Sequence, residues 1–308
     1  MTTFIAVLKR RSPSNERPGP DLNGLRFHYP QWFLTPAIVL FVVFFAIPTF
    51  ASLFFAFTRW TLSDFQFIGV DNFVNFFRDP QLSQGFLHTL VYGVVTSLSK
   101  VVLGFFLAVF LTSPVLGRGY LRSVVFFPVL VSTVGVGLTF KTLLDPFHGI
   151  VNGALSAFGI QGPGWLADPR MALMTVAAVD IWKGVGLATL IFIAGIVAIP
   201  QEYFEAARVD GAGVWGIIRR ITIPLSYPAI TTVVILSLIG GLRSFDLIWT
   251  MTSGGPGFTS DVIGSVIYKE YQAGFYGLST AGNVILIVVV AAIMVPLTRY
   301  LRGREVDQ

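Results

Sequence analysis

The strongest constraint in this sequence is a series of long apolar segments, each about as long as the roughly 20 residues that a helix needs to cross a bilayer. Backbone groups inside lipid must find hydrogen-bond partners within the protein, so each segment is expected to be a helix. Only 12% of the 308 residues are charged, about half the fraction typical of a soluble domain. The sequence therefore predicts an all-α integral membrane protein with six transmembrane helices. The six segments are 33–57, 86–112, 121–144, 171–199, 227–247 and 281–301.

Composition excludes several kinds of site. The chain has no cysteine, which rules out disulfides and thiolate metal sites. Its three histidines, His28, His88 and His148, are scattered and form no metal-ligand spacing. The net charge of +5 is compatible with nucleic acid, but membrane proteins also gather Lys and Arg at their cytoplasmic edges. We therefore expect no nucleic-acid partner, no metal and no cofactor bound by this chain.

The distribution of cations predicts the orientation. If both termini are cytoplasmic, thirteen Lys and Arg lie in cytoplasmic segments and four in outer segments. Cytoplasmic loops of membrane proteins carry such an excess, so both termini are predicted to be cytoplasmic. The polar residues 1–30 are then a cytoplasmic tail. A cleaved signal peptide is not expected here, because the apolar stretch that follows is too long and ends in no small-residue cleavage site.

The outer connections are predicted to hold short elements. Residues 58–85 include an aromatic, amphipathic stretch that is expected to form a short helix on the outer surface. Residues 145–170 are expected to contain a short helix and turns. Residues 250–272 include "TSGGPGFTSD", in which three glycines and a proline predict an irregular loop.

A polar segment joins the fourth and fifth apolar stretches and begins with a predicted helix. Pro200 is suited to the start of a helix, because its missing N–H is not needed in the first turn. Glu205 and Arg208 are three residues apart and can pair on one helical face. Ala206 and Ala207 have almost no side chain, so another surface can approach this helix closely.

A turn and a second short helix complete this segment. Asp210–Gly211 is a turn signal, a helix is expected from about 214 to 221, and Pro224 is expected to open the fifth membrane helix. The product is a rigid helix-turn-helix anchored at both ends in membrane helices, which suits docking with a soluble partner. The alternative is an interfacial loop that only connects two helices.

The spacing of this segment resembles a known signature. It is similar to the Glu-Ala-Ala motif of permease subunits from binding-protein-dependent ABC importers, in which the pattern ends in Leu-Pro rather than Ile-Pro. The matching positions are Glu205, Ala206, Ala207, Gly211, Ile221 and Ile223-Pro224. The stretches "FIGVDNFVNFF", "GIVNGAL" and "FDLIWTMTSGGP" resemble the carbohydrate and glycerol-phosphate branch, and the last resembles the maltose-type member of the permease pair.

The resemblance implies a type I ABC importer permease fold with four regions: a tail at 1–30, a first helix and outer segment at 31–84, a core at 85–301 and a tail at 302–308. Within the core, coupling helices near 200–224 would contact an ATPase. The implied coupling residues are Glu205, Ala206, Ala207, Asp210 and Gly211.

The resemblance also implies partners. They are a second, homologous permease subunit, two cytoplasmic ATPase subunits and an extracytoplasmic solute-binding protein. The substrate would be a carbohydrate, most often a disaccharide or oligosaccharide, moved across the cytoplasmic membrane by alternating access. The chain contains no G-x-x-x-x-G-K-[ST] run, so ATP and Mg are expected on the partner ATPase and no catalytic residue is expected here.

Charged residues inside the apolar segments form a second candidate site. Asp180 and Lys183 share a face of the fourth helix, and Arg243 and Asp246 share a face of the fifth. Lys100, beside serines and a threonine, is expected to face a cavity. One interpretation is internal pairing that holds the bundle together, and the other is a polar lining for a solute path. The residues proposed for that path are Asp180, Trp182, Lys183, Arg243, Phe245, Asp246, Trp249 and Asn283.

Two other classes of function are compatible with parts of this pattern. A secondary transporter driven by an ion gradient would use intramembrane acids such as Asp180 and Asp246. Such transporters typically show repeated halves with broken helices, and no repeat or break is evident in the sequence. A membrane-embedded enzyme is disfavoured because no histidine lies within reach of an acid along a helix.

Overall fold

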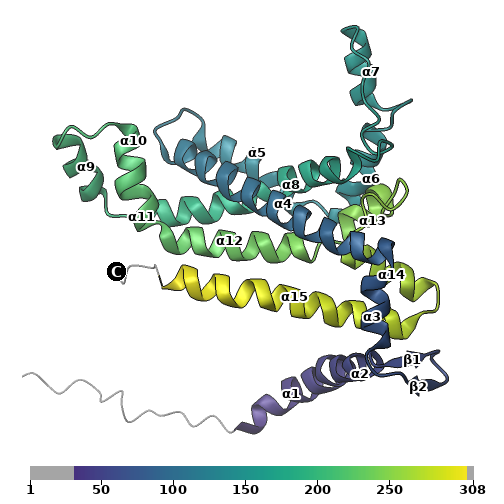
Figure 1. Ribbon diagram of the computed structural model, residues 1–308. Coiled ribbons are helices and arrows are strands. Elements are labelled where there is room, and N and C mark those ends of the chain that lie inside the picture. The colour runs from purple at the N-terminus through teal and green to yellow at the C-terminus, as the bar shows by residue number, and fades with distance from the viewer. Residues whose placement is uncertain (1–30, 304–308) are drawn as a thin grey trace, which may run out of the picture. The chain divides into compact units, whose positions relative to one another are not determined.

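The computed structural model describes residues 31–303, and helices dominate it (Figure 1). The chain divides into two compact units, residues 1–50 and 51–308, which are described separately. The predicted tail at 1–30 and residues 304–308 of the predicted C-terminal tail lie outside the described residues.

The first unit contains the start of the first predicted span. A 3-10 turn at Gln31–Leu34 leads into α1 (Thr35–Phe41), a π-helical turn (Val42–Ala46) and α2 (Ile47–Phe55), which continues into the second unit. Its side chains are almost all apolar and exposed, as expected where lipid replaces water.

The second unit begins with a short hairpin and an outer helix. Strands β1 (Thr58–Trp60) and β2 (Phe65–Phe67) pair antiparallel, with Thr58 opposite Phe67. Helix α3 (Asp71–Arg78) confirms the short amphipathic helix predicted from the sequence. Asn72 fixes it to the hairpin by donating to the carbonyl oxygens of Ala56 and Thr58 at 2.9 and 2.8 Å.

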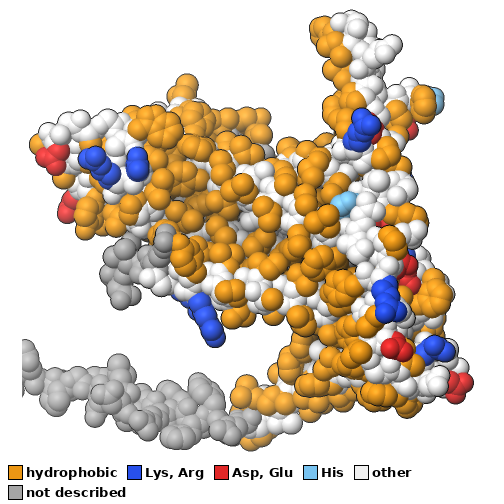
Figure 2. All heavy atoms as spheres, viewed as in Figure 1, with side chains coloured by type: hydrophobic (Ala, Val, Ile, Leu, Met, Phe, Trp, Pro, Cys, Tyr) orange, Lys and Arg blue, Asp and Glu red, His pale blue; other side chains and the backbone are white. Residues whose placement is uncertain are grey.

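Long helices form the body of this unit. They are α4 (Pro80–Thr112), α8 (Ala172–Val197), α12 (Tyr227–Leu242) and α15 (Tyr276–Arg302). Helix α4 begins where Asp79 accepts a hydrogen bond from the Gln81 amide at 2.7 Å, a typical N-cap contact. Figure 2 shows hydrophobic side chains along the middle of these helices and charged ones gathered toward their two ends, as a bilayer requires.

Two spans are bent rather than straight. Helices α5 (Arg118–Leu130) and α6 (Thr133–Leu143) meet at 96°, and Val214–Leu225 meets α12 at 72°. Within residues 31–303, four helices are long and apolar enough to cross a membrane, and counting each bent pair as one span gives the predicted six. The expectation that Pro224 opens the fifth membrane helix is wrong, because the bend places that start at Tyr227.

Shorter helices occupy the connections between the long ones. Helix α7 (Ile150–Ala157) projects away from the long helices (Figure 1), and α13 (Asp246–Thr252) and α14 (Ile263–Gln272) follow α12. At the other end lie α9 (Gln201–Val209), α10 (Val214–Ile217), a π-helical turn (Ile218–Thr222) and α11 (Ile223–Leu225).

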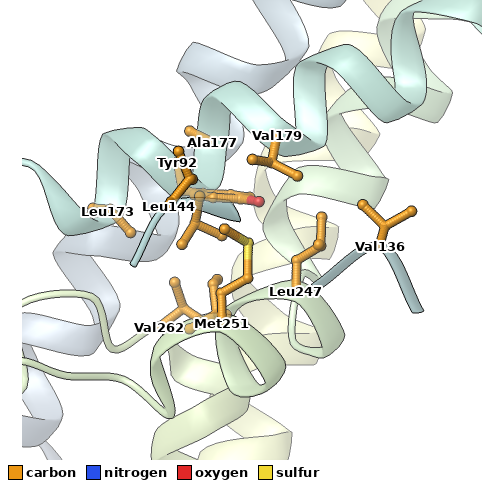
Figure 3. Packing of buried hydrophobic residues seen from close by; sticks show 11 residues of the cluster. Tyr92, Val136, Leu144, Leu173, Ala177, Val179, Leu247, Met251 and Val262 are labelled. Carbon is orange, nitrogen blue, oxygen red and sulfur yellow. The ribbon is translucent and has the colours of Figure 1, made fainter. Parts of the chain in front are cut away.

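Small residues let the long helices approach closely. A Cβ added to Gly104 of α4 would lie 2.8 Å from the Cβ of Ala188 on α8, and one added to Gly93 would lie 2.8 Å from Leu242 of α12. At the α13 end a buried cluster that includes Tyr92, Val179 and Met251 joins helices distant in sequence (Figure 3). The helices that carry the candidate site are therefore fixed against each other by packing.

Candidate functional site

The first candidate region is the segment 200–226, which forms a helix-turn-helix at one end of the long helices (Figure 1). Pro200 is the N-cap of α9, and Asp210 is its C-cap. Gly211 has a φ of +77°, a conformation that glycine adopts without steric cost, and it makes the turn predicted at Asp210–Gly211. We call this segment the protrusion.

The side chains of the protrusion leave a largely unpaired surface. The expected pair between Glu205 and Arg208 does not form, because Glu205 Oε1 instead accepts a hydrogen bond from Gln201 at 2.8 Å. The side chain of Arg208 lines a groove of about 660 Å³ between α9, α10 and the ends of α4 and α8. Val209 and Trp215 are 87% and 70% exposed. Exposed apolar side chains thus lie on the same segment as Ala206 and Ala207.

The second candidate region contains the charges at membrane depth, and the structure changes how they pair. Asp180 of α8 contacts Lys100 of α4, with Oδ2 and Nζ 2.9 Å apart and both side chains largely buried. A Cβ on Gly184 would lie 2.7 Å from Cε of Lys100, so the absence of a side chain at Gly184 makes room for that lysine. The interpretation in which Asp180 neutralises Lys183 is therefore wrong, and so is the expectation that Lys100 faces a cavity.

Lys183 and Arg243 differ from Lys100 in this respect. Lys183 is half-buried and Arg243 is exposed, and no carboxylate within residues 31–303 forms an ion pair with either. Arg243 and Asp246 do not share a helical face, because α12 ends at Leu242 and α13 begins at Asp246.

Trp182 lies in a pocket of about 660 Å³ between α6, α8 and the connection that precedes α8. Its ring packs against Phe140 with centroids 5.2 Å apart and ring planes tilted by 58°. Trp165 lines the same pocket and is held by a 2.8 Å hydrogen bond from its Nε1 to Asn152 Oδ1. Flat apolar rings with one cation, Arg170, at the wall suit a ligand with both apolar faces and polar edges.

A second aromatic cluster lies beyond the break in the fifth span. Phe245 and Trp249 stack with centroids 5.8 Å apart, and both contact Tyr268 of α14, at 5.4 and 4.7 Å. Phe245, Tyr268, Tyr271, Ser279 and Asn283 line a hollow of about 270 Å³. The structure thus brings together the predicted Phe245, Trp249 and Asn283. The sequence analysis missed Tyr268 and Tyr271, although two tyrosines three residues apart in "YKEY" were a usable signal.

A buried ion pair orders the loop between α13 and α14, and the sequence analysis missed it as well. Asp261 is 1% exposed, Lys269 Nζ lies 2.6 Å from its Oδ2, and Ser265 donates to its Oδ1 at 2.7 Å. His88 Nδ1 of α4 lies 2.9 Å from the Asp261 carbonyl oxygen. Burial raises the pKa of the Asp261 carboxyl, although hydrogen bonds from Lys269 and Ser265 act in the opposite direction. The glycine-rich loop is irregular, as predicted, but tied to α4 and α14.

Residues 27–304 match the family of binding-protein-dependent transport system inner membrane components. The chain therefore belongs to this family, and it is a multi-pass permease component of an ABC importer in the inner membrane. No broken helix is evident in the sequence, and this spoke against a secondary transporter. The structure contains bent spans, so that argument does not hold. Membership of this family is what excludes that alternative.

Individual relatives match over nearly the whole chain. The trehalose/maltose transport system permease protein MalF of Thermococcus litoralis is 29% identical, over 88% of this chain and 93% of that protein. A bacterial ABC transporter involved in the import of the acidic polysaccharide alginate is 28% identical, with a TM-score of 0.80 over 89% of this chain and 96% of the other. A bacterial alginate ABC transporter in complex with alginate pentasaccharide-bound periplasmic protein matches at 28% identity and a TM-score of 0.78, over 86% and 91%.

The Asp261–Lys269 pair predicts a pH-dependent loss of stability. Replacing Lys269 by Met leaves a buried carboxylate without its cation, which costs about 3 kcal/mol in typical buried pairs. An acid whose pKa is raised by folding stabilises the fold at low pH and loses that contribution as pH rises through the folded-state pKa. The Lys269→Met protein should therefore show a larger fall in Tm at pH 8 than at pH 5.

Thermal unfolding of the purified protein at the two pH values measures this effect. The double variant with Asp261→Asn removes the charge as well and serves as the control, because its Tm deficit should not depend on pH in this way. An equal deficit at both pH values in Lys269→Met would show that the ion pair does not hold the loop.

Proposed function

We propose that this chain is the permease subunit of an ATP-driven importer that moves a carbohydrate, a disaccharide or oligosaccharide, by alternating access. The names of the relatives, for trehalose/maltose and for alginate, support the substrate class. One observation carries the proposal: the same long helices join an exposed, small-residue protrusion at one end to aromatic pockets at the other (Figure 1). A motor contact at one end can thus act on a solute site at the other.

In this proposal the protrusion is the contact with a separate ATPase. Ala206 and Ala207 permit close approach, Gly211 sets the angle between α9 and α10, and Asp210 ends α9. Glu205 presents its carboxylate, held by Gln201, to the partner. Both termini and the protrusion lie in the cytoplasm, which the excess of Lys and Arg supports. ATP and Mg are bound by two ATPase subunits, since this sequence has no P-loop.

The opposite end receives solute from an extracytoplasmic binding protein and shares the path with a second permease subunit. The neighbouring transporter that was solved with a loaded periplasmic protein supports this arrangement. Trp182, Phe245 and Trp249 supply flat apolar faces, and Lys183 and Arg243 supply donors without an ion-pair partner within residues 31–303. Because a lone charge in the membrane costs about 2.5–3.5 kcal/mol, such groups are expected to face water or solute.

The remaining predicted path residues have different roles in this proposal. Asp180, paired with Lys100, holds the wall that carries Trp182 and does not contact solute. Asp246 and Asn283 are exposed and stay in the path.

The energy source tests the class of transport. Uptake of radiolabelled trehalose, maltose or an alginate tetrasaccharide into proteoliposomes containing the full complex is expected to require ATP and the binding protein. Replacing the P-loop lysine of the ATPase should abolish uptake, while an uncoupler should leave it unchanged. Uptake that survives loss of ATP hydrolysis but collapses with the uncoupler would contradict the proposal.

The turn of the protrusion tests the coupling contact. Leucine at Gly211 must adopt a left-handed conformation that costs roughly 1–2 kcal/mol, so α10 should be displaced and ATPase binding weakened. Co-purification of the ATPase with Gly211→Leu should fall about tenfold while the chain still inserts in the membrane. Gly213→Leu is the matched control, because Gly213 has a φ of −72° and open space around it. Equal ATPase recovery from both variants would remove the coupling role from this turn.

Lys183 tests the solute path. Lys183→Ala is expected to change the KM for the transported sugar several-fold without loss of ATPase co-purification, because its ammonium would donate to solute rather than to protein. Lys183→Arg keeps the charge and should retain more of the wild-type KM. Unchanged uptake kinetics in Lys183→Ala would return this lysine to a purely structural role.

A further inference from the structure

A hollow of about 270 Å³, which we call the Tyr268 pocket, lies between Phe245, α14 and the start of α15. Figure 1 shows α14 and the start of α15 at the end of the long helices opposite the protrusion. Phe245 and Tyr268 form adjacent walls, with ring planes tilted by 59°. Gly264, Ile267, Tyr271, Ser279 and Asn283 complete the lining. None of these residues lines the Trp182 pocket, so the two hollows are separate.

Of the polar side chains in this pocket, Ser279 is already engaged, since its hydroxyl donates to the Ile267 carbonyl oxygen at 2.9 Å, and the others are largely open. The phenol hydroxyls of Tyr268 and Tyr271 make no hydrogen bond within residues 31–303. Asn283 Nδ2 makes one long contact, 3.4 Å to the carbonyl oxygen of Ser279, and its carbonyl oxygen has no partner in that part of the chain. Two hydroxyls and an amide thus offer donors and acceptors around an aromatic wall.

These features match one chemical class of ligand. A sugar ring has apolar C–H faces, which pack on aromatic rings, and hydroxyls at its edge, which pair with phenols and amides. The volume is near the lower end of the range for ligand pockets, about 300 Å³, so it suits a single ring rather than a whole oligosaccharide.

Tyrosines near the end of a membrane helix also occur as belts that anchor a protein at the bilayer interface. A belt explains Tyr268 and Tyr271 but not Asn283, an exposed amide on the second turn of a membrane span, facing the same hollow. A polar side chain there is costly against lipid and favourable against water or a polar ligand. The chain between α12 and α13 reaches this pocket through Phe245, so the hollow borders packed protein on that side.

We propose that the Tyr268 pocket is an outer subsite that holds one ring of the incoming carbohydrate before the solute reaches Trp182. Tyr268 supplies the stacking face together with Phe245, and Asn283 pairs with the ring hydroxyls. This inference rests on the proposed function, since it takes the solute to be a carbohydrate.

Binding of radiolabelled trehalose, maltose and an alginate tetrasaccharide to the full complex in nanodiscs, without the binding protein, tests the subsite directly. Loss of one aromatic contact is worth roughly 0.5–1.5 kcal/mol, so Tyr268→Ala should raise the Kd of the tightest-binding probe about three- to tenfold. Tyr268→Phe keeps the ring and should raise it less. Asn283→Leu, of similar size, should also weaken binding and serves if Tyr268→Ala fails to assemble. The control is Tyr120→Ala, an exposed tyrosine of α5 outside this pocket.

The outcomes separate the two proposals. If the wild-type complex binds and imports a probe but Tyr268→Ala and Asn283→Leu leave its Kd unchanged, the subsite is wrong and the proposed function stands. A lower Tm with an unchanged Kd identifies a belt and also overturns the subsite. If the wild-type complex neither binds nor imports any of the probes, the carbohydrate proposal itself fails, and the subsite fails with it.

Discussion

The ion pair between Lys100 and Asp180 is the interaction on which the arrangement of the long helices depends. It joins α4 to α8 at membrane depth, where a lone charge is costly, and removing one partner of such a buried pair typically costs about 3–5 kcal/mol. Gly184, one helical turn from Asp180, makes room for the lysine, so both residues face α4. Trp182 lies two residues from each of them and therefore points to a different side of α8. The pair therefore determines which side chains of α8 are left for solute.

Helix continuity is what connects the two candidate regions in the proposed mechanism. Helix α8, which carries Trp182, ends at Val197, and α9 begins at Gln201 after Pro200. The protrusion therefore follows almost directly on α8. Helix α4 has 33 residues, which is about 50 Å of rise, enough to extend from one end of the unit to the other. The bends at α5–α6 and before α12 are places where such helices can change angle, whereas their packed interiors resist deformation.

Most predictions that used local sequence succeeded, apart from the helix start at Pro224, and those that paired side chains failed. The helix at Asp71–Arg78 and the turn at Asp210–Gly211 follow from amphipathicity and turn chemistry within a few residues. Asp180 was assigned to Lys183 because they are three residues apart, yet its partner is 80 residues away. The break at 243–245 was missed because apolar residues continue on both sides of it. The Tyr268 pocket combines Phe245, α14 and α15, which no pattern within a single segment could reveal.

By itself, the sequence determined the membrane class, the six spans, the helix-turn-helix between the fourth and fifth, and the resemblance that family membership confirms. The length of the apolar segments, the turn residues and the motif spacing predict these features, because each feature depends on interactions over a few residues. Only the tertiary structure showed that Lys100 forms an ion pair with Asp180 and that Lys183 has no ion-pair partner in the described chain. It also showed that Tyr268 and Asn283 line the same pocket. Those outcomes depend on which helix faces approach each other, and packing between distant segments sets that.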